Sequence, residues 1–156
     1  MAKMYSILQL KSNAGNEQKV VFELEPNTAW IETTPHKFEG IVNFNGSAVM
    51  QNDVVEVQAD IQVPIKFICD KCGLPFTKNL NAKTAATYDE ISEFDDPTDI
   101  ELEYKIQSNR IDLEPLIRDA IIENMPSKVL CKEDCKGLCP HCGENLNISE
   151  CRCKKI

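Results

Sequence analysis

The sequence predicts an α+β fold, in which an antiparallel β-sheet or a partly open barrel contains a long hairpin and is covered by one helix. Three observations predict it: apolar and polar residues alternate over residues 38–67, an apolar stripe at helical spacing runs over 112–125, and eight cysteines are present, six of them after residue 130. The 156 residues suffice for a buried core, and a content of 42% hydrophobic and 27% charged residues is that of an ordinary globular protein.

The predicted hairpin spans residues 38–67. Its first half places apolar or small residues at even positions, namely Phe38, Gly40, Val42, Phe44, Gly46, Ala48 and Met50. Its second half places them at odd positions, namely Val55, Val57, Ala59, Ile61, Val63, Ile65 and Phe67. This period of two is typical of strands with one face packed against the core and the other exposed to solvent. We expect the turn of the hairpin at residues 51–53. Asn45-Gly46 is a competing tight-turn signal that would shorten the hairpin. Further strands are expected around residues 5–10, 19–24 and 83–88.

One helix is expected over residues 112–125. Its apolar stripe consists of Leu113, Leu116, Ile117, Ala120, Ile121 and Met125. Asp112 is a suitable N-cap, Pro115 fits the first turn, and Pro126 ends the helix. An amphipathic helix of this kind is expected to cover the β layer.

Two parts are expected along the chain. Residues 1–126 form a β-rich core that includes the helix, with an acidic, solvated loop at residues 89–103 between the strands and the helix. Residues 127–156 contain too few large apolar residues for a core of their own, so we expect a cysteine-rich module that docks on the β-rich core.

The negative charge of the chain is local. Lys and Arg number 17 and Asp and Glu number 25, a net charge of -8, and eight of the acids lie in residues 89–103, where there is no base. The rest of the chain is balanced and shows no basic field, which argues against tight, autonomous binding of nucleic acid. Residues 1–11 lack the features of a signal peptide and no run of 18 apolar residues exists, so we expect a soluble cytoplasmic protein.

The cysteines are the strongest chemical signal in the sequence. They stand in close pairs at Cys69, Cys72, Cys131, Cys135, Cys139, Cys142, Cys151 and Cys153. Such pairs suit either disulfides or a metal, and without an export signal we favour zinc over disulfides. Cys69–Gly73 and Cys139–Gly143 share the C-x-x-C-G pattern of zinc-ribbon knuckles, in which the final glycine adopts a positive φ.

Eight thiolates fit two four-sulfur zinc sites, and two pairings are open. In the first, Cys139 and Cys142 bind one zinc with Cys151 and Cys153, and Cys69 and Cys72 bind the other with Cys131 and Cys135. In the second, the two knuckles share one zinc and the other four cysteines bind the second. We favour the first pairing because it requires only one long-range loop closure. Four thiolates leave no position for water, so the zinc would be structural and the C-terminal module zinc-ribbon-like.

The same pairs allow a redox reading, because a C-x-x-C motif can lower a thiol pKa. Such a motif needs a helix that starts at its first cysteine, and Gly73-Leu74-Pro75 opposes a helix after Cys72. No catalytic motif is present, so we expect no enzymatic activity. His36 and His141 have no recognisable partner and are expected to be surface residues.

Three blocks, residues 68–72, 111–119 and 131–147, resemble the YceD family when they are taken in this order. The family usually has Arg and Leu in its first knuckle where this chain has Lys71 and Gly73. The resemblance implies a role in the synthesis, processing or stability of 23S ribosomal RNA, and it implies no catalytic residue.

Two mechanisms would link such a protein to ribosomal RNA. In one, the zinc module and nearby lysines contact the RNA directly. In the other, the protein is an adaptor whose acidic segment, residues 89–103, binds a basic ribosomal or assembly protein. The charge distribution favours the adaptor.

Overall fold

The computed structural model describes residues 3–90, 104–140 and 142–147. Within these residues the chain is mostly β, with eight strands and two α-helices. The elements in chain order are β1 (Met4–Ser6), α1 (Leu8–Ser12), β2 (Gln18–Leu24), the 3₁₀ helix η1 (Thr28–Ile31), β3 (Lys37–Phe38), β4 (Val42–Gln51), β5 (Val54–Ile68), β6 (Pro75–Glu90), β7 (Lys105–Ile106), β8 (Arg110–Asp112) and α2 (Glu114–Asn124).

The predicted hairpin is confirmed as β4 and β5, which pair antiparallel from Asn43↔Gln62 to Gln51↔Val54. Its two-residue turn consists of Asn52 and Asp53, whose φ values of 53° and 63° suit a type I′ turn. The competing Asn45-Gly46 turn is not formed, because Gly46 lies inside β4 opposite Ala59. Of the shorter strands, residues 19–24 lie in β2, whereas 5–10 are only partly β because α1 starts at Leu8.

The strands form one open, mixed sheet in the order β2-β4-β5-β6-β7, with β3 alongside β5. All pairs are antiparallel except β6 with β7, which pair in parallel over two residues. Edge strands β2 and β7 do not pair with each other, so the alternative of a partly open barrel is not realised among the described residues. A separate ladder joins β1 to β8.

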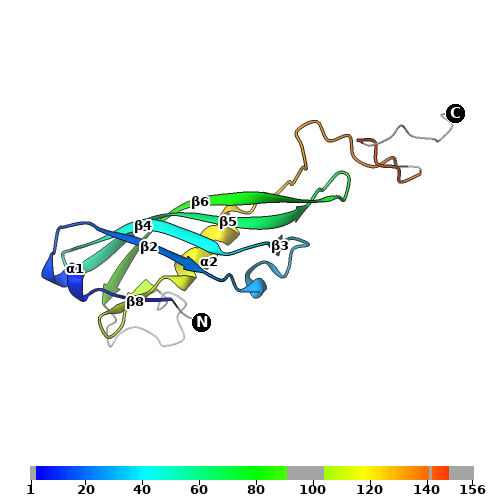
Figure 1. Ribbon diagram of the computed structural model, residues 1–156. Coiled ribbons are helices and arrows are strands. Elements are labelled where there is room, and N and C mark those ends of the chain that lie inside the picture. Colours follow the sequence, from blue (N-terminus) through cyan, green and yellow to red (C-terminus); the bar gives the residue numbers. More distant parts are fainter. Residues whose placement is uncertain (1–2, 91–103, 141, 148–156) are drawn as a thin grey trace.

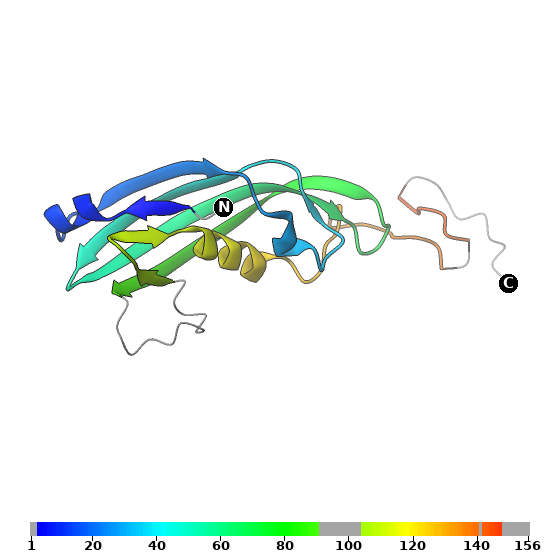
Figure 2. The same cartoon turned by 90° about the horizontal axis from the view of Figure 1, so that it is seen from below.

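One face of the sheet carries the core. The odd-numbered residues of β5 from Val55 to Phe67 are buried, as the alternation predicts. Helix α2 covers this face, and Leu116, Ile117, Ala120 and Ile121 of its apolar stripe are buried against the strands. Figures 1 and 2 show α2, β1 and β8 on the same side of the long sheet.

The helix begins two residues later than the sequence predicts. Asp112 belongs to β8 and Leu113 occupies the N-cap position, because the β1–β8 ladder holds residues 110–112 extended. Asp112 still serves the helix start, since its carboxylate accepts the backbone N–H of Glu114 at 3.0 Å. The helix ends at Asn124, before Pro126.

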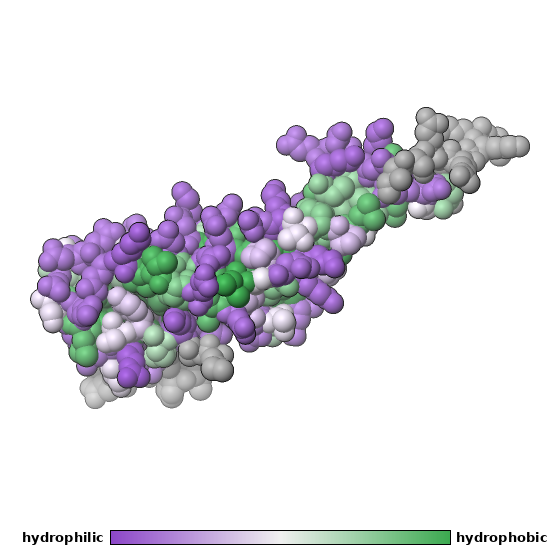
Figure 3. Space-filling model, viewed as in Figure 1, coloured by the Kyte–Doolittle hydropathy of each residue, from purple (hydrophilic) through white to green (hydrophobic). Residues whose placement is uncertain are grey.

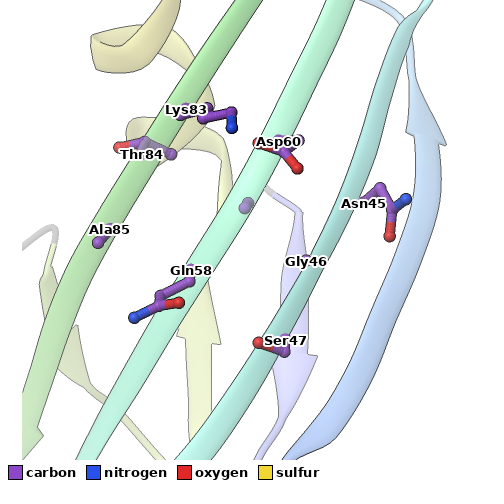
Figure 4. Close-up of a pocket in the computed structure, with 9 residues that line it drawn as sticks. Asn45, Gly46, Ser47, Gln58, Asp60, Lys83, Thr84 and Ala85 are labelled. Atoms are coloured by element: carbon purple, nitrogen blue, oxygen red, sulfur yellow. The ribbon is translucent and has the colours of Figure 1, made fainter.

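The other face of the sheet is polar. Asn45, Asp60 and Lys83 lie side by side on β4, β5 and β6, and around them is a shallow hollow of about 550 Å³ (Figure 4). Among the described residues, no helix has the length and apolar character that crossing a membrane requires.

Strands β5 and β6 are the longest strands of the sheet. Their ladder runs from Val55↔Tyr88 to Ile68↔Pro75, so β6 begins eight residues before the predicted strand 83–88. The loop that joins them, residues 69–74, lies at the opposite end of β5 from the Asn52-Asp53 turn. Figure 1 shows this loop beside the chain that follows α2.

Candidate metal centre

The first knuckle is a tight loop between β5 and β6. The backbone N–H of Cys69 donates to the carbonyl of Leu74, and the N–H of Gly73 donates to the carbonyl of Cys69, both at 3.0 Å. Gly73 has φ = 73°, which a residue with a Cβ rarely adopts, and this explains why a glycine follows the second cysteine. The turn directs Cys69 and Cys72 to one side of the hairpin end.

The chain after α2 returns to this loop. Asp70 and Val129 exchange two hydrogen bonds: the N–H of Asp70 donates to the carbonyl of Val129 at 2.7 Å, and the N–H of Val129 donates to the Asp70 carboxylate at 2.6 Å. Val129 is 5% exposed and belongs to the main core. This anchor places Cys131 and Cys135 opposite the first knuckle.

Cys69, Cys72, Cys131 and Cys135 form one cluster, which we call the four-thiol cluster. Their four Sγ atoms all lie within 4.8 Å of one another. The Sγ atoms of Cys69 and Cys135 are 3.6 Å apart, as are those of Cys72 and Cys131. A tetrahedral zinc with Zn–S bonds of about 2.3 Å requires sulfurs about 3.8 Å apart, whereas a disulfide requires about 2.05 Å. The spacing therefore fits a four-thiolate metal site and not a disulfide.

N–H groups point at the sulfurs of the cluster. The N–H of Cys131 donates to Sγ of Cys69 at 3.3 Å, and the side-chain amide of Asn147 donates to Sγ of Cys135 at 3.4 Å. The other end of the Asn147 amide accepts the N–H of Lys136 at 2.8 Å, which fixes its orientation. Such donors stabilise thiolates and orient metal ligands. No local motif in the sequence marks Asn147 as a partner of the thiols.

These contacts shift the pKa values of the thiols in different directions. Burial opposes ionisation of Cys69, but N–H groups that include those of Cys72 and Cys131 lower its pKa to about 6. Burial and the neighbouring thiols, Cys72 first, raise the pKa of Cys131 to about 12. Burial likewise opposes ionisation of Cys135, but the side-chain amide of Asn147 helps to lower its pKa. Cys69 and Cys135 therefore ionise more readily than Cys131, and ionisation of the remaining thiols meets repulsion that a divalent cation would relieve.

His36 lies beneath the first knuckle, contrary to the expectation of a surface histidine. It is 9% exposed, its Nδ1 accepts the N–H of Ile68 at 3.1 Å, and its ring meets Phe67 edge-on. Ile68 directly precedes Cys69, so His36 supports the end of β5 from which the first knuckle begins. No local pattern marks this role, because the partners are 32 residues apart in the chain.

The second knuckle repeats the hydrogen bonds of the first. The N–H of Cys139 donates to the carbonyl of Glu144 at 2.8 Å, and the N–H of Gly143 donates to the carbonyl of Cys139 at 2.9 Å. Gly143 has φ = 75°. The second knuckle is joined to the first through the N–H of Leu138, which donates to the carbonyl of Lys71 at 3.2 Å.

Of the two pairings that the sequence left open, the structure brings Cys69 and Cys72 together with Cys131 and Cys135, as in the favoured one. Cys139 is buried and Cys142 is exposed, and neither belongs to the four-thiol cluster. Cys151, Cys153 and His141 lie outside the described residues.

The acidic segment is described only at its start. Asp89 pairs with Lys105 at 2.9 Å and Glu90 pairs with Lys11 at 3.5 Å. Residues 91–103, which carry most of the predicted acidic loop, lie outside the described part of the chain.

Comparison with known proteins finds a matching family model and a curated relative. The family model described as large ribosomal RNA subunit accumulation protein YceD matches residues 57–156. The large ribosomal RNA subunit accumulation protein YCED homolog 1, chloroplastic, of Zea mays is 32% identical over 111 residues, which is 70% of this chain and 34% of that protein. This chain therefore spans about a third of the length of the maize relative. No solved structure matches the chain.

The family match begins in β5 and includes the first knuckle, α2, the four-thiol cluster and the second knuckle. The resemblance that three short blocks suggest is thus confirmed over a continuous stretch, and the chain belongs to the YceD family of large ribosomal RNA subunit accumulation proteins.

Proposed function

We propose that this chain is a non-enzymatic, zinc-binding protein of ribosome biogenesis that supports the synthesis, processing or stability of 23S ribosomal RNA. The observation that carries the proposal is the four-thiol cluster, three of whose cysteines are buried and whose sulfur spacing suits a tetrahedral metal, in a member of the YceD family. Four thiolates close the coordination of a zinc ion and leave no position for a reacting water. The metal would therefore hold the hairpin end and the chain after α2 together.

A second zinc is part of the proposal. Because the second knuckle has the same two hydrogen bonds and the same positive-φ glycine as the first, it presents Cys139 and Cys142 in a conformation suited to a metal. Cys151 and Cys153 are the remaining thiols of the chain and would complete this site. We retain the two-part organisation, with residues 127–156 as the zinc module, and a cytoplasmic location, where thiols stay reduced.

Metal content tests the proposal directly. The protein purified under reducing conditions should contain about two zinc ions per chain by atomic emission, as expected for eight thiolates in closed four-sulfur sites. Cys135→Ser should remove the zinc of the four-thiol cluster, and Cys142→Ser should remove the second. Lys132→Ala, which changes the residue next to Cys131 and no thiol, is the matched control and should retain both. A compact, metal-free protein with all its thiols open to alkylation would contradict the proposal.

The biological half of the proposal needs a separate readout. Cells that express Cys135→Ser in place of the native protein should accumulate less 23S ribosomal RNA, whereas Lys132→Ala should restore the native level. If cells with the zinc-free variant kept the native level of 23S ribosomal RNA, the ribosomal role would not depend on metal binding.

We favour an adaptor over direct RNA contact as the mode of action. The excess of acid over base in residues 89–103 suits a basic ribosomal or assembly protein better than a phosphate backbone. Neutralising Asp95, Asp96, Asp99 and Glu101 should abolish capture of purified basic ribosomal proteins. Unchanged capture, together with RNA binding that falls steeply with salt, would favour direct contact instead.

The redox alternative finds one supporting observation in the lowered pKa of Cys69. Against it, Cys69 is 2% exposed and faces three other thiols, whereas a redox thiol must reach its partner. Cys69→Ser is the test. Loss of a disulfide reductase activity with unchanged zinc content would support the redox function.

A further inference from the structure

Strand β6 has one open edge. Along its other edge it pairs with β5 over its whole length up to Tyr88, but on the open side only Asp89 and Glu90 pair, with the short strand β7. The stretch from Pro75 to Tyr88 therefore has no strand on its open side within the described part of the chain.

The register shows which backbone groups face this open edge. The N–H of Glu39 donates to the carbonyl of Pro64 at 2.9 Å, so the backbone of Pro64 points toward β3 and away from β6. Pro64 pairs with Asn79, and this pair is therefore a non-hydrogen-bonded one. It follows from the alternation that Thr77, Asn79 and Asn81 direct their N–H and C=O groups to the open edge. No backbone hydrogen bond from any described residue reaches these groups.

A groove of about 510 Å³ runs along this edge. One wall is β6 itself, from Lys78 to Asn81, and the other wall is the chain from Asn124 to Glu133. Its floor is apolar: Phe67, Leu80 and Val129 are buried there, and Phe76 and Leu130 are partly buried against the four-thiol cluster. In Figure 3 apolar surface continues along the narrow end of the molecule, where the sheet meets the chain after α2.

The rim of the groove has a surplus of positive charge. Lys78 and Lys128 line it together with a single acid, Glu133. Neither lysine has an ion pair among the described residues. An occupant with an acidic side chain would therefore pair with a cation without having to break an existing contact.

We propose that the open edge of β6 binds an extended segment of a partner protein, which adds a strand to the sheet, places an apolar side chain on the groove floor and places an acidic side chain near Lys78 and Lys128. Only a peptide strand supplies donors and acceptors in alternation at the spacing that Thr77, Asn79 and Asn81 present. An RNA backbone, in contrast, would present mainly hydrogen-bond acceptors to these N–H and C=O groups. The proposal goes beyond the role of zinc in ribosome biogenesis, since it names a binding surface for protein outside the metal ligands and the acidic segment.

The first step of the test is a selection. The zinc-loaded full chain is immobilised and screened with a phage-displayed library of random dodecapeptides, and the best binder is made synthetically. We expect selected peptides to share an extended pattern with apolar residues and at least one Asp or Glu. A library that yields no binder above background would overturn the proposal.

The second step uses a pair of variants at one position. Asn79→Pro removes one open-edge N–H without removing a β5–β6 hydrogen bond, because proline is tolerated at such edge positions. It should weaken binding of the synthetic peptide roughly tenfold, the loss expected for one backbone hydrogen bond together with the clash of the proline ring. Asn79→Ala keeps the N–H and should bind as the native protein does. Equal binding by both variants would overturn the proposal.

Hydrogen exchange keeps the test decisive even if Asn79→Pro does not fold. On addition of the peptide to the native protein, the amides of Thr77, Asn79 and Asn81 should gain protection. Protection confined to other residues would overturn the proposal. So would displacement of the peptide from these amides by a single-stranded oligouridylate, because the groove would then be an RNA site. Zinc content measured on the same samples separates these outcomes from a failure of the metal site.

Discussion

At position 46 the sheet has no room for a side chain. A Cβ added to Gly46 would lie 2.3 Å from the carbonyl oxygen of Gln58 and 2.8 Å from Cβ of Ala59 on β5. The closer of these contacts is to the backbone of β5, which cannot move without breaking the ladder. The glycine that resembles a turn signal in the sequence is therefore a close-contact position within a strand.

Gly46→Ala should lower the free energy of unfolding by about 1–3 kcal/mol, the usual cost of overpacking a well-packed site. Urea unfolding followed by circular dichroism measures the change. Asn45→Ala, at the exposed neighbouring position, is the control and should change stability by less than about 0.5 kcal/mol. A Gly46→Ala variant as stable as the native protein would show that β4 and β5 can separate locally.

At the scale of elements, two tyrosines in mutual contact connect the end of β6 to β8 and α2: Tyr88, near the end of β6, bonds to β8, and Tyr104, just before β7, bonds to α2. The Tyr88 hydroxyl donates to the carbonyl of Asp112 at 3.2 Å, and the Tyr104 hydroxyl donates to the carboxylate of Asp119. The two rings also contact each other, with centroids 5.6 Å apart. Burial, with the Asp112 and Asp119 carboxylates, raises the pKa of Tyr88 well above its ordinary value. Burial and the hydrogen bond to Asp119 do the same to the pKa of Tyr104.

These shifts predict a loss of stability in alkali. A tyrosine with a raised folded-state pKa stays neutral at pH values where the unfolded chain already ionises, at about pH 10. Its contribution to stability is therefore fully present below about pH 10 and decreases as the pH rises above it. Urea unfolding at about pH 9 and about pH 11 should show this decrease, and Tyr104→Phe should reduce it, because that variant has one ionisable phenol fewer. An equal decrease in the native protein and the variant would contradict the assignment to Tyr104.

The contrast between β4 and β6 shows which elements sequence patterns reveal. In β4 the inward-facing residues are almost all apolar, so the alternation of apolar and polar residues is easy to recognise in the sequence. In β6 the inward-facing positions include two polar residues, the exposed Lys78 and the half-buried Thr84, because α2 and the chain after it do not cover the whole strand. The alternation is therefore lost over the part of β6 that borders the groove, and the sequence predicts only residues 83–88.

At the scale of the whole molecule, two apolar clusters, both in contact with Phe76, hold the described part of the chain together. The main core joins the sheet to α2, and a small cluster of Cys69, Cys72 and Cys135 with Phe76, Leu130 and Cys131 joins the hairpin end to the chain after α2. The main core contains none of the cysteines. The sheet should therefore be able to stay folded when the metal site is dismantled.

Chelation of zinc should loosen the chain around residues 128–136 and leave the sheet intact, because bound metal contributes its binding free energy to the part of the fold it connects. Brief digestion with trypsin should then cut faster after Lys128 and Lys132, while Lys83, inside the sheet, should stay resistant. Far-UV circular dichroism should change little. Loss of the β signal on chelation would show that the metal site and the sheet unfold as one unit.

The features that the sequence by itself determined are local. The alternation of apolar and polar residues, the turn at residues 51–53, the amphipathic stripe and the two C-x-x-C-G knuckles each depend on residues a few positions apart, and each is present in the structure. Tertiary structure decided which thiols meet, that His36 supports Ile68, and that β6 keeps an open edge beside a groove. These depend on segments tens of residues apart in the chain, which come together only when burial of the shared core outweighs the entropy of closing the loops between them.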